Sequence, residues 1–400
     1  MSKKWLLLII SVIILTIIWQ IGFFDNLLDE TINAPDTDSG VDEEKPDINE
    51  PDNSETTIPV EEIVSIEQLE YEVEIIGEGF NIPWEIVPLP DGRFLITQRG
   101  GEIVLLNEGE IYNLHDVNHI GEGGLLGLTL SFEFNENNHL FLYYTYQENG
   151  ELYNRVSRFT FEDSTLKDEV YIIEGIPGSR YHNGGRIKFG TDEKLYITTG
   201  DASNRSLSQD IDSLAGKILR INPDGTIPED NPFENSPVYA YGFRNPQGLA
   251  WHPETNQLFA SDHGPDRHDE INLVIAGENY GWPNITCSES SSDYQSPIAC
   301  YTEFTLAPSG IDFLVMENLI EAPLFVAGLR GNMIMRIDLD GDGNFVREQA
   351  LFRDYGRIRN VKYYQGSLYV LTNNRDGRGT LGESDDLIIK ITPKIEAENK

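Results

Sequence analysis

The most constraining feature of this sequence is a repeat of short apolar strands, each of which follows a polar turn. Six pairs of candidate strands recur at roughly 45 to 65 residue intervals. The pairs are 91–97 with 102–106, 138–144 with 154–161, 193–199 with 217–221, 256–261 with 269–274, 322–327 with 333–337, and 365–371 with 386–391. Long helical periodicity is absent after residue 60, whereas turn dipeptides are frequent. The repeat predicts an all-β fold, a six-bladed β-propeller of four-stranded antiparallel blades over residues 63–397. A two-domain β-sandwich is the alternative.

The residues before the repeat have a different composition. Met1–Lys4 is basic and Trp5–Trp19 is almost entirely Leu, Ile and Val, the pattern of an export signal. Because no small-residue cleavage site follows, residues 1–28 fit an uncleaved membrane anchor slightly better than a cleaved signal peptide. Residues 29–62 are mostly Asp, Glu, Pro, Asn, Ser and Thr, too polar to offset the entropy of ordering. We therefore expect an exported chain that is either held at the outer face of the cytoplasmic membrane or secreted, with a disordered acidic linker.

The net charge and the cysteine content limit the ligands and metal sites that this chain can have. The formal net charge is −38 with a pI near 4.3, which argues against nucleic acid because phosphate binding depends on Lys and Arg. Seven histidines and two cysteines leave no room for a Cys-rich zinc framework. Cys287 and Cys300 lie in one loop-rich region, and in an exported chain they predict a disulfide.

Two polar stretches stand out between apolar segments. Tyr241–Leu249 crowds Arg244, Asn245, glycine and proline together, and Asp262–Asn272 repeats this character. Such composition predicts loops that a scaffold holds for chemistry. From the residues alone, Arg244 could either brace a loop by binding carbonyl groups or face an anion.

His182 lies in the loop Ser179–Gly190, directly before a predicted strand. A neutral imidazole is a common proton acceptor for an alcohol, although an isolated histidine in a loop is more often a surface residue. Arg330 follows another strand, and the two-residue spacing of Arg357 and Arg359 places both on one side of an extended segment. Arginines clustered in so acidic a chain suggest a small molecule with several negative charges.

One acidic stretch mimics a calcium loop. Asp338–Asn344 has the right beginning, but the twelfth position holds Gln349 in place of glutamate. A hairpin turn is the better interpretation.

Together these residues resemble one family, the soluble PQQ-dependent glucose and aldose sugar dehydrogenases, also called the glucose/sorbosone dehydrogenase family. The resemblance covers about residues 70 to 395 and rests on many motifs in order. They are Pro83-Trp84, Leu89–Gly92, Gly121–Gly127, the His182 loop, Leu214–Ile221, Ile227–Pro232, Gly242–Gly248, Gly264–Asn272 and Asn279–Pro283.

The resemblance implies a six-bladed propeller that binds pyrroloquinoline quinone (PQQ) at the mouth of its axis and oxidises aldoses at the C1 hydroxyl to lactones. His182 would be the general base, and Arg244 would stabilise negative charge on the cofactor. Asn245, Arg330, Arg357 and Arg359 would hold the cofactor. The carbonyls of Gly264 and Pro265 would bind a calcium ion beside it, and Glu270 with the Tyr280 carbonyl a structural calcium ion.

Three positions depart from the pattern of the glucose enzymes. Glu122 stands where they carry a substrate-binding glutamine, and Tyr181 stands where they carry an aspartate beside the base. Arg330 replaces a lysine. These changes and the absence of several long loops make the chain resemble the aldose sugar dehydrogenase branch, with an unidentified electron acceptor. A calcium-dependent sugar lactonase and a propeller that binds carbohydrate or protein without turnover are the alternatives.

Overall fold

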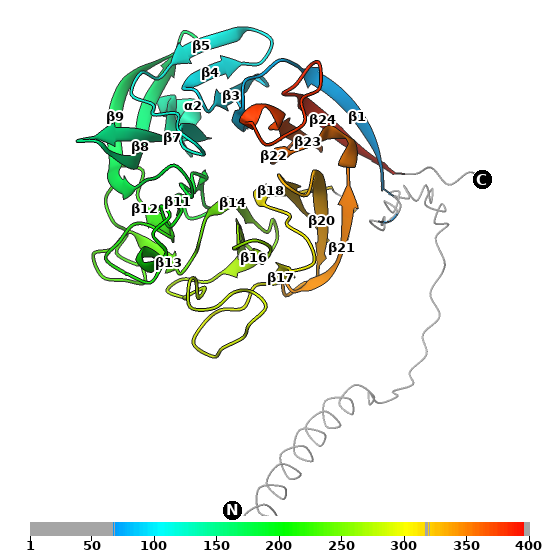
Figure 1. Ribbon diagram of the computed structural model, residues 1–400. Coiled ribbons are helices and arrows are strands. Elements are labelled where there is room, and N and C mark those ends of the chain that lie inside the picture. The colour runs from blue at the N-terminus through cyan, green and yellow to red at the C-terminus, as the bar shows by residue number, and fades with distance from the viewer. Residues whose placement is uncertain (1–66, 68, 317–318, 320, 396–400) are drawn as a thin grey trace, which may run out of the picture. The chain divides into compact units, whose positions relative to one another are not determined.

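The computed structural model describes residues 67, 69–316, 319 and 321–395. Six antiparallel four-stranded sheets surround a common axis (Figure 1). The predicted six-bladed β-propeller is therefore confirmed. The anchor or signal peptide predicted at 1–28 and the linker predicted at 29–62 lie outside the described residues. In the part of the chain that the structure describes, no helix is long and apolar enough to cross a membrane.

Consecutive strands build each blade, except that the sixth blade takes its outermost strand from the beginning of the fold. Blade one holds β2 (Pro83–Pro88), β3 (Phe94–Gln98), β4 (Glu102–Leu105) and β5 (Gly109–Asn113), and blade two holds β6 (Leu125–Leu130), β7 (His139–Glu148), β8 (Glu151–Glu162) and β9 (Thr165–Pro177). Blade three holds β10 (Ile187–Phe189), β11 (Leu195–Thr199), β12 (Lys217–Ile221) and β13 (Val238–Tyr241), and blade four holds β14 (Pro246–Trp251), β15 (Leu258–Asp262), β16 (Asp269–Val274) and β17 (Ala299–Tyr301). Blade five holds β18 (Pro308–Phe313), β19 (Leu324–Gly328), β20 (Met333–Leu339) and β21 (Phe345–Leu351), and blade six holds β22 (Ile358–Tyr364), β23 (Ser367–Thr372), β24 (Ile388–Ile395) and β1 (Leu69–Gly77). Short helical turns are α2 (Phe134–Asn137), η2 (Arg205–Ser208), η3 (Arg353–Tyr355) and η4 (Asn374–Asp376).

The six predicted strand pairs are the second and third strands of the six blades. These strands pack between neighbouring blades, and every residue of β3, β11, β15 and β19 is buried. Burial on both faces requires the continuous apolar runs that made them visible in the sequence. The outermost strands lack this signal because they face solvent, as the exposed first five residues of β21 show.

Pairing of β1 with β24 closes the ring. The register runs from Leu69 opposite Ile395 to Gly77 opposite Ile388. Leu69, Ile389 and Ile391 bury their side chains in one cluster with the neighbouring blade. The last blade therefore joins two chain segments that are more than three hundred residues apart in the sequence.

The innermost strands carry polar residues toward the axis. Glu85 on β2 pairs with Arg186, which precedes β10, and also accepts a hydrogen bond from Asn360 on β22. Asp312 on β18 binds Lys188 at 3.0 Å and Lys362 at 3.4 Å. These paired charges fill the axis below the loops, and they break the apolar pattern that would otherwise reveal the innermost strands.

Bulges near the start of the innermost strands re-aim individual side chains. Pro246 pairs with Asp262 and Gly248 with Ser261, so Gln247 is left as the extra residue. The same irregularity lies between Ile358 and Asn360. Arg359 is therefore at a bulge, and simple two-residue alternation does not explain where it points.

The structure corrects the extent of the two predicted loops. Only residues 242–245 connect β13 to β14, because Pro246–Leu249 lies within β14, and only 263–268 connects β15 to β16.

The hairpin turn at Asp338–Asn344 is confirmed, since the Asp340 N–H donates to the Asn344 carbonyl at 2.9 Å between β20 and β21. The Cys287–Cys300 disulfide is also confirmed, with Cα atoms 5.6 Å apart.

We predict that this disulfide stabilises the loop between β16 and β17. A cross-link over a 13-residue separation reduces the entropy of the unfolded chain and contributes up to about 3 kcal/mol. The double variant Cys287→Ser/Cys300→Ser should unfold at a lower temperature than the oxidised protein and should not respond to reductant. Equal melting temperatures would contradict the prediction.

Candidate active site

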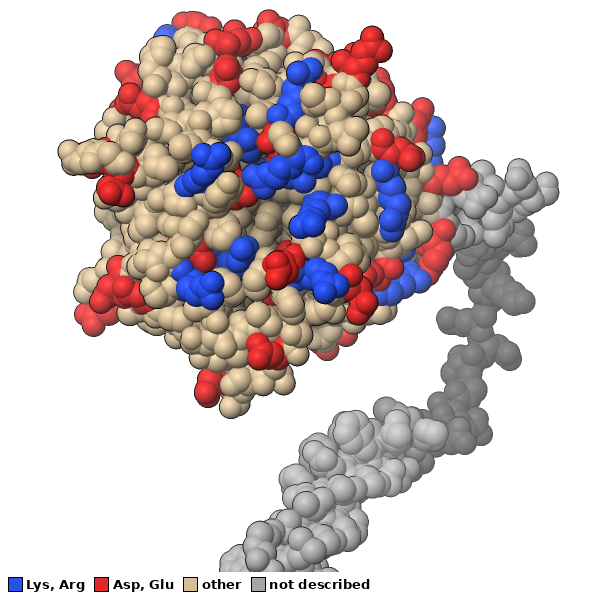
Figure 2. Space-filling model, in the orientation of Figure 1, with Lys and Arg blue, Asp and Glu red and all other residues tan. Residues whose placement is uncertain are grey.

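A cavity of about 460 Å³ opens where the innermost strands begin. The loops that connect one blade to the next, together with those between second and third strands, supply its walls. Its lining residues are Glu122, His182, Arg244, Asn245, Gln247, His263, Gly264, Asp269, Thr305, Ala307, Leu329, Arg330, Arg357, Arg359 and Arg378. Five are arginines and only two are acidic, although the whole chain is strongly acidic. In Figure 2 the basic side chains gather mostly around the centre of the face shown.

Most of the predicted site residues meet in this cavity. They are Glu122, His182, Arg244, Asn245, Gly264, Arg330, Arg357 and Arg359. The predicted calcium ligands Pro265, Glu270 and Tyr280 do not line it. Seven other lining residues were not predicted: Gln247, His263, Asp269, Thr305, Ala307, Leu329 and Arg378.

His182 forms a hydrogen-bonded pair with Asp201, a residue that the sequence reasoning missed. The His182 Nδ1 atom lies 2.7 Å from Asp201 Oδ1. Asp201 is 2 % exposed and also accepts hydrogen bonds from the Ser203 N–H at 2.8 Å and the Trp282 indole N–H at 2.9 Å. An ionised carboxylate at this position favours a proton on Nδ1, which leaves Nε2 free to accept one.

The backbone around this pair is tightly packed. His182 has a φ of 61°, and the Ala202 N–H donates to its carbonyl at 3.1 Å. A Cβ at Gly200 would lie 2.1 Å from the same carbonyl oxygen, so only glycine fits there. In the sequence, Gly200 and Asp201 directly follow the predicted strand 193–199, and this pattern could have indicated the Asp201 site. Asp201 therefore supplies the carboxylate that Tyr181 cannot.

Arg244 and Asn245 are held by a buried carboxylate. Their backbone N–H groups donate to the two oxygens of Asp262 at 2.9 and 2.6 Å. The Arg244 Nη1 atom donates to the His263 carbonyl at 3.0 Å, and its guanidinium lies 5.4 Å from the centre of a Trp282 ring. Arg244 thus braces the loop by binding a carbonyl group, and it also lines the cavity, where it could face an anion.

Arg357 and Arg359 form the most buried part of the basic cluster. The Arg357 Nη2 atom binds Asp376 at 3.0 Å, and Arg359 Nη1 donates to Gln247 at 2.8 Å and Ser309 at 3.3 Å. Burial lowers the pKa of both guanidinium groups, and for Arg359 burial with the charges of Arg99 and Arg357 brings the pKa to about 9. Since only part of this positive charge is balanced, the cluster favours an anionic ligand.

Several buried donors of this region have no partner among the described residues. They are the Nε atoms of Arg357 and Arg359 and the Nδ2 atom of Asn245. Buried donors are normally hydrogen-bonded, so these atoms point to a ligand that would complete them. Two of the three donors are cationic, which fits an anionic molecule with several oxygen acceptors, as PQQ is.

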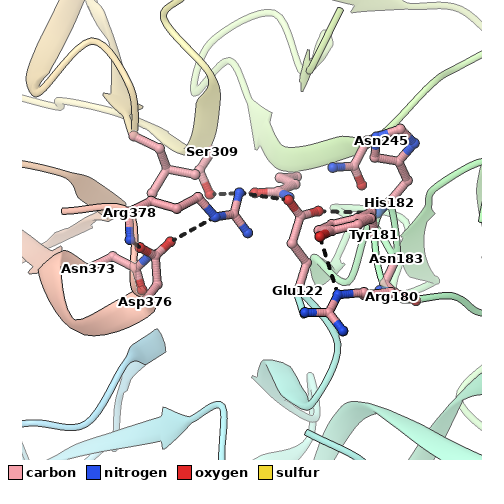
Figure 3. A network of polar contacts seen from close by, with 12 residues as sticks. Glu122, Arg180, Tyr181, His182, Asn183, Asn245, Ser309, Asn373, Asp376 and Arg378 are labelled. Carbon is pink, nitrogen blue, oxygen red and sulfur yellow. Dashed lines mark hydrogen bonds and ion pairs between the residues drawn. The ribbon is translucent and has the colours of Figure 1, made fainter. Parts of the chain in front are cut away.

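Glu122 and Arg378 face each other beside His182 (Figure 3). The Arg378 Nη1 atom donates to Glu122 Oε1 at 2.9 Å, and the His182 N–H donates to Oε2 at 3.1 Å. Burial alone would raise the pKa of Glu122, but Arg378, His263 and the His182 N–H outweigh it and bring the pKa to about 2. Glu122 therefore carries a negative charge at neutral pH.

The residues predicted to bind calcium have mixed surroundings. Glu270 lies opposite Asp262 in the sheet, and burial together with the Asp262 charge raises the pKa of Glu270 to about 8. The buried Asn272 Oδ1 atom has no hydrogen-bond partner within the described part of the chain, which fits a cation here. The Pro265 carbonyl, by contrast, already contacts His268 Nδ1 at 3.2 Å. Among the described residues no group of three or more His, Cys, Asp and Glu side chains could hold a metal, so backbone and amide oxygens would have to contribute.

Comparison with known proteins agrees with this geometry. The sequence model of the glucose/sorbosone dehydrogenase family matches residues 80–388. The chain is 30% identical to aldose sugar dehydrogenase YliI of Escherichia coli over 354 residues, which cover 80% of this chain and 93% of that protein. It is 33% identical to quinoprotein glucose dehydrogenase B of Acinetobacter calcoaceticus over 262 residues, or 56% of this chain and 55% of that protein.

A solved structure shows the same fold. It is the PQQ-bound form of an aldose sugar dehydrogenase from Streptomyces coelicolor, with a TM-score of 0.75 and 37% sequence identity. The match covers 81% of this chain and 99% of the Streptomyces chain. With its six-bladed fold and its arginine-rich cavity at the axis, this chain belongs to the glucose/sorbosone dehydrogenase family of oxidoreductases.

Proposed function

We propose that this protein oxidises aldose sugars at the C1 hydroxyl to lactones, with PQQ and calcium as cofactors. The observation that carries the proposal is that His182 and the arginine cluster line the same cavity. A proton acceptor and an anion-binding wall are the two components that such a reaction needs from the protein. The PQQ-bound relative from Streptomyces coelicolor supports the choice of cofactor.

Asn245, Arg330, Arg357 and Arg359 would hold PQQ through charge-assisted hydrogen bonds, and the unpartnered donors would be completed by its oxygens. When bound, PQQ supplies an acceptor for the hydride that leaves C1 of the sugar. Arg244 would place positive charge beside the cofactor's oxygens, where negative charge develops during the reaction.

His182 would take the proton of the C1 hydroxyl at Nε2. Asp201 keeps the imidazole in the required tautomer and stabilises the imidazolium that forms, since its carboxylate lies 2.7 Å from Nδ1. Glu122 would accept hydrogen bonds from sugar hydroxyls at the side of the base.

Calcium would bind at two places. The Gly264 and Pro265 carbonyls would hold one ion close to PQQ, once Pro265 is released from His268. Glu270 and the Tyr280 carbonyl would hold the other ion. The positive charge of this calcium ion would relieve the repulsion between Glu270 and Asp262.

The arginine cluster separates this proposal from its alternatives. A calcium-dependent lactonase would need carboxylate ligands around the axis rather than guanidinium groups. A propeller that only binds carbohydrate or protein would have no use for the His182–Asp201 pair.

Removal of the base should stop turnover without removing the cofactor. His182→Ala is expected to lower kcat by about a hundredfold to ten-thousandfold, because proton transfer loses its acceptor. PQQ absorbance should show that the cofactor is still bound. The matched control is His115→Ala, an exposed histidine outside the cavity, which should keep normal activity. Full turnover by His182→Ala would remove His182 from the role of base.

Loss of one buried arginine should weaken cofactor binding. For Arg357→Ala we expect the Kd for PQQ, measured by equilibrium dialysis, to rise about tenfold or more, because a charge-assisted contact is lost. Arg353→Ala removes an exposed arginine from the same loop outside the cavity and should bind PQQ normally. An unchanged affinity for Arg357→Ala would mean that the cluster does not hold PQQ.

Calcium should stabilise the protein through Glu270. Calcium at about a hundred times its Kd should stabilise the fold by about 2.7 kcal/mol, which raises the melting temperature by several degrees. Glu270→Gln should lose the part of this increase that comes from its own site, whereas Asp293→Asn, which changes an exposed acid in a nearby loop, should keep the whole increase. If the protein with and without calcium melts at one temperature, the calcium proposal is wrong.

A further inference from the structure

An ion pair crosses the mouth of the cavity beside the proposed base. Glu122 comes from the loop between β5 and β6, and Arg378 comes from the loop between β23 and β24, 256 residues later. Their side chains meet at 2.9 Å, and the other oxygen of Glu122 accepts the His182 N–H (Figure 3). The pair therefore connects the proposed base to the opposite wall.

Both ends of this pair are fixed by the backbone. The Glu122 N–H donates to the Arg180 carbonyl at 2.8 Å, and a Cβ at Gly121 would lie 2.2 Å from that oxygen, so the two loops are pressed together. The Arg378 N–H donates at 2.9 Å to Asp376, whose fully buried side chain pairs with Arg357. Such anchoring distinguishes the pair from a chance contact between two surface side chains.

The position of the pair places it against a bound sugar. Glu122 binds the backbone N–H of His182 itself, so a sugar whose C1 hydroxyl reaches the imidazole brings its neighbouring groups close to Glu122. The Arg378 side chain is 45% exposed. Its Nη1 atom contacts Glu122, and its Nε atom lies 3.9 Å from Asp376 Oδ2. Acceptor lone pairs of Glu122 and donors of Arg378 are thus available together, with no net charge.

We propose that Arg378 is a specificity-determining residue, which with Glu122 presents a neutral hydrogen-bonding pair that selects uncharged aldoses. Sugar hydroxyls can donate to the carboxylate and accept from the guanidinium. An aldose that carries a carboxylate meets the charge of Glu122, while the opposing charge of Arg378 is already neutralised. This inference rests on the proposed function, because it takes His182 as the group that receives the sugar.

The test is a double-mutant cycle on the PQQ-loaded protein. The measured quantity is the kcat/KM for glucuronate divided by that for glucose. In Glu122→Gln the guanidinium of Arg378 loses its ion pair with Glu122 and keeps only the longer contact of 3.9 Å with Asp376, so the ratio should rise about tenfold or more. In Arg378→Gln the carboxylate is unpaired, and the ratio should fall. The double variant should return toward the unmodified ratio, and Arg378→Lys should preserve it because it keeps the charge.

Arg353→Gln is the control, since it removes one positive charge from an exposed position outside the cavity and should leave the ratio unchanged. Parallel losses for both sugars in Glu122→Gln and Arg378→Gln would overturn the inference, because they would show a structural role alone. If the unmodified protein oxidises no sugar, the proposed function fails first. Equilibrium binding of glucuronate then decides the inference separately, and binding to Glu122→Gln no tighter than to the unmodified protein overturns it.

Discussion

Pairing of β1 with β24 is the contact on which the rest of the molecule depends. It joins the two ends of the fold in one blade and turns a row of sheets into a closed ring. Only a closed ring brings the loop of Glu122 opposite that of Arg378, and His182 opposite Arg357 and Arg359. The site is therefore a property of the whole ring rather than of any single blade.

The balance of positive and negative charge differs along the axis of the ring. Below the loops the charges are paired, as Glu85 with Arg186 and Asp312 with Lys188 show. At the mouth of the axis, arginines outnumber carboxylates, and the buried Nε atoms of Arg357 and Arg359 have no hydrogen-bond partner among the residues that the structure describes. Burying like charges without compensation is unfavourable, so this cavity favours an anionic ligand.

The sequence predicted the strands that are buried on both faces and the site residues that lie within the family motifs. The second and third strands of all blades were predicted because each contains apolar or aromatic residues that pack between blades, and eight of the residues implied by the family resemblance do line the cavity. The innermost strands were not predicted because polar groups such as Glu85 and Gln247 face the axis and interrupt the apolar pattern. Asp201 and Arg378 were not predicted because their partners, His182 and Glu122, lie in other loops, 19 and 256 residues away. Neither local propensity nor periodicity contains that information.

We propose that this ring holds PQQ where His182 can deprotonate a sugar. The most direct measurement is the absorbance of the protein loaded with stoichiometric PQQ and calcium, recorded after an aldose is added without any electron acceptor. The spectrum of the oxidised cofactor should disappear in a single turnover, and one equivalent of lactone should form. An unchanged spectrum with the cofactor bound would contradict it.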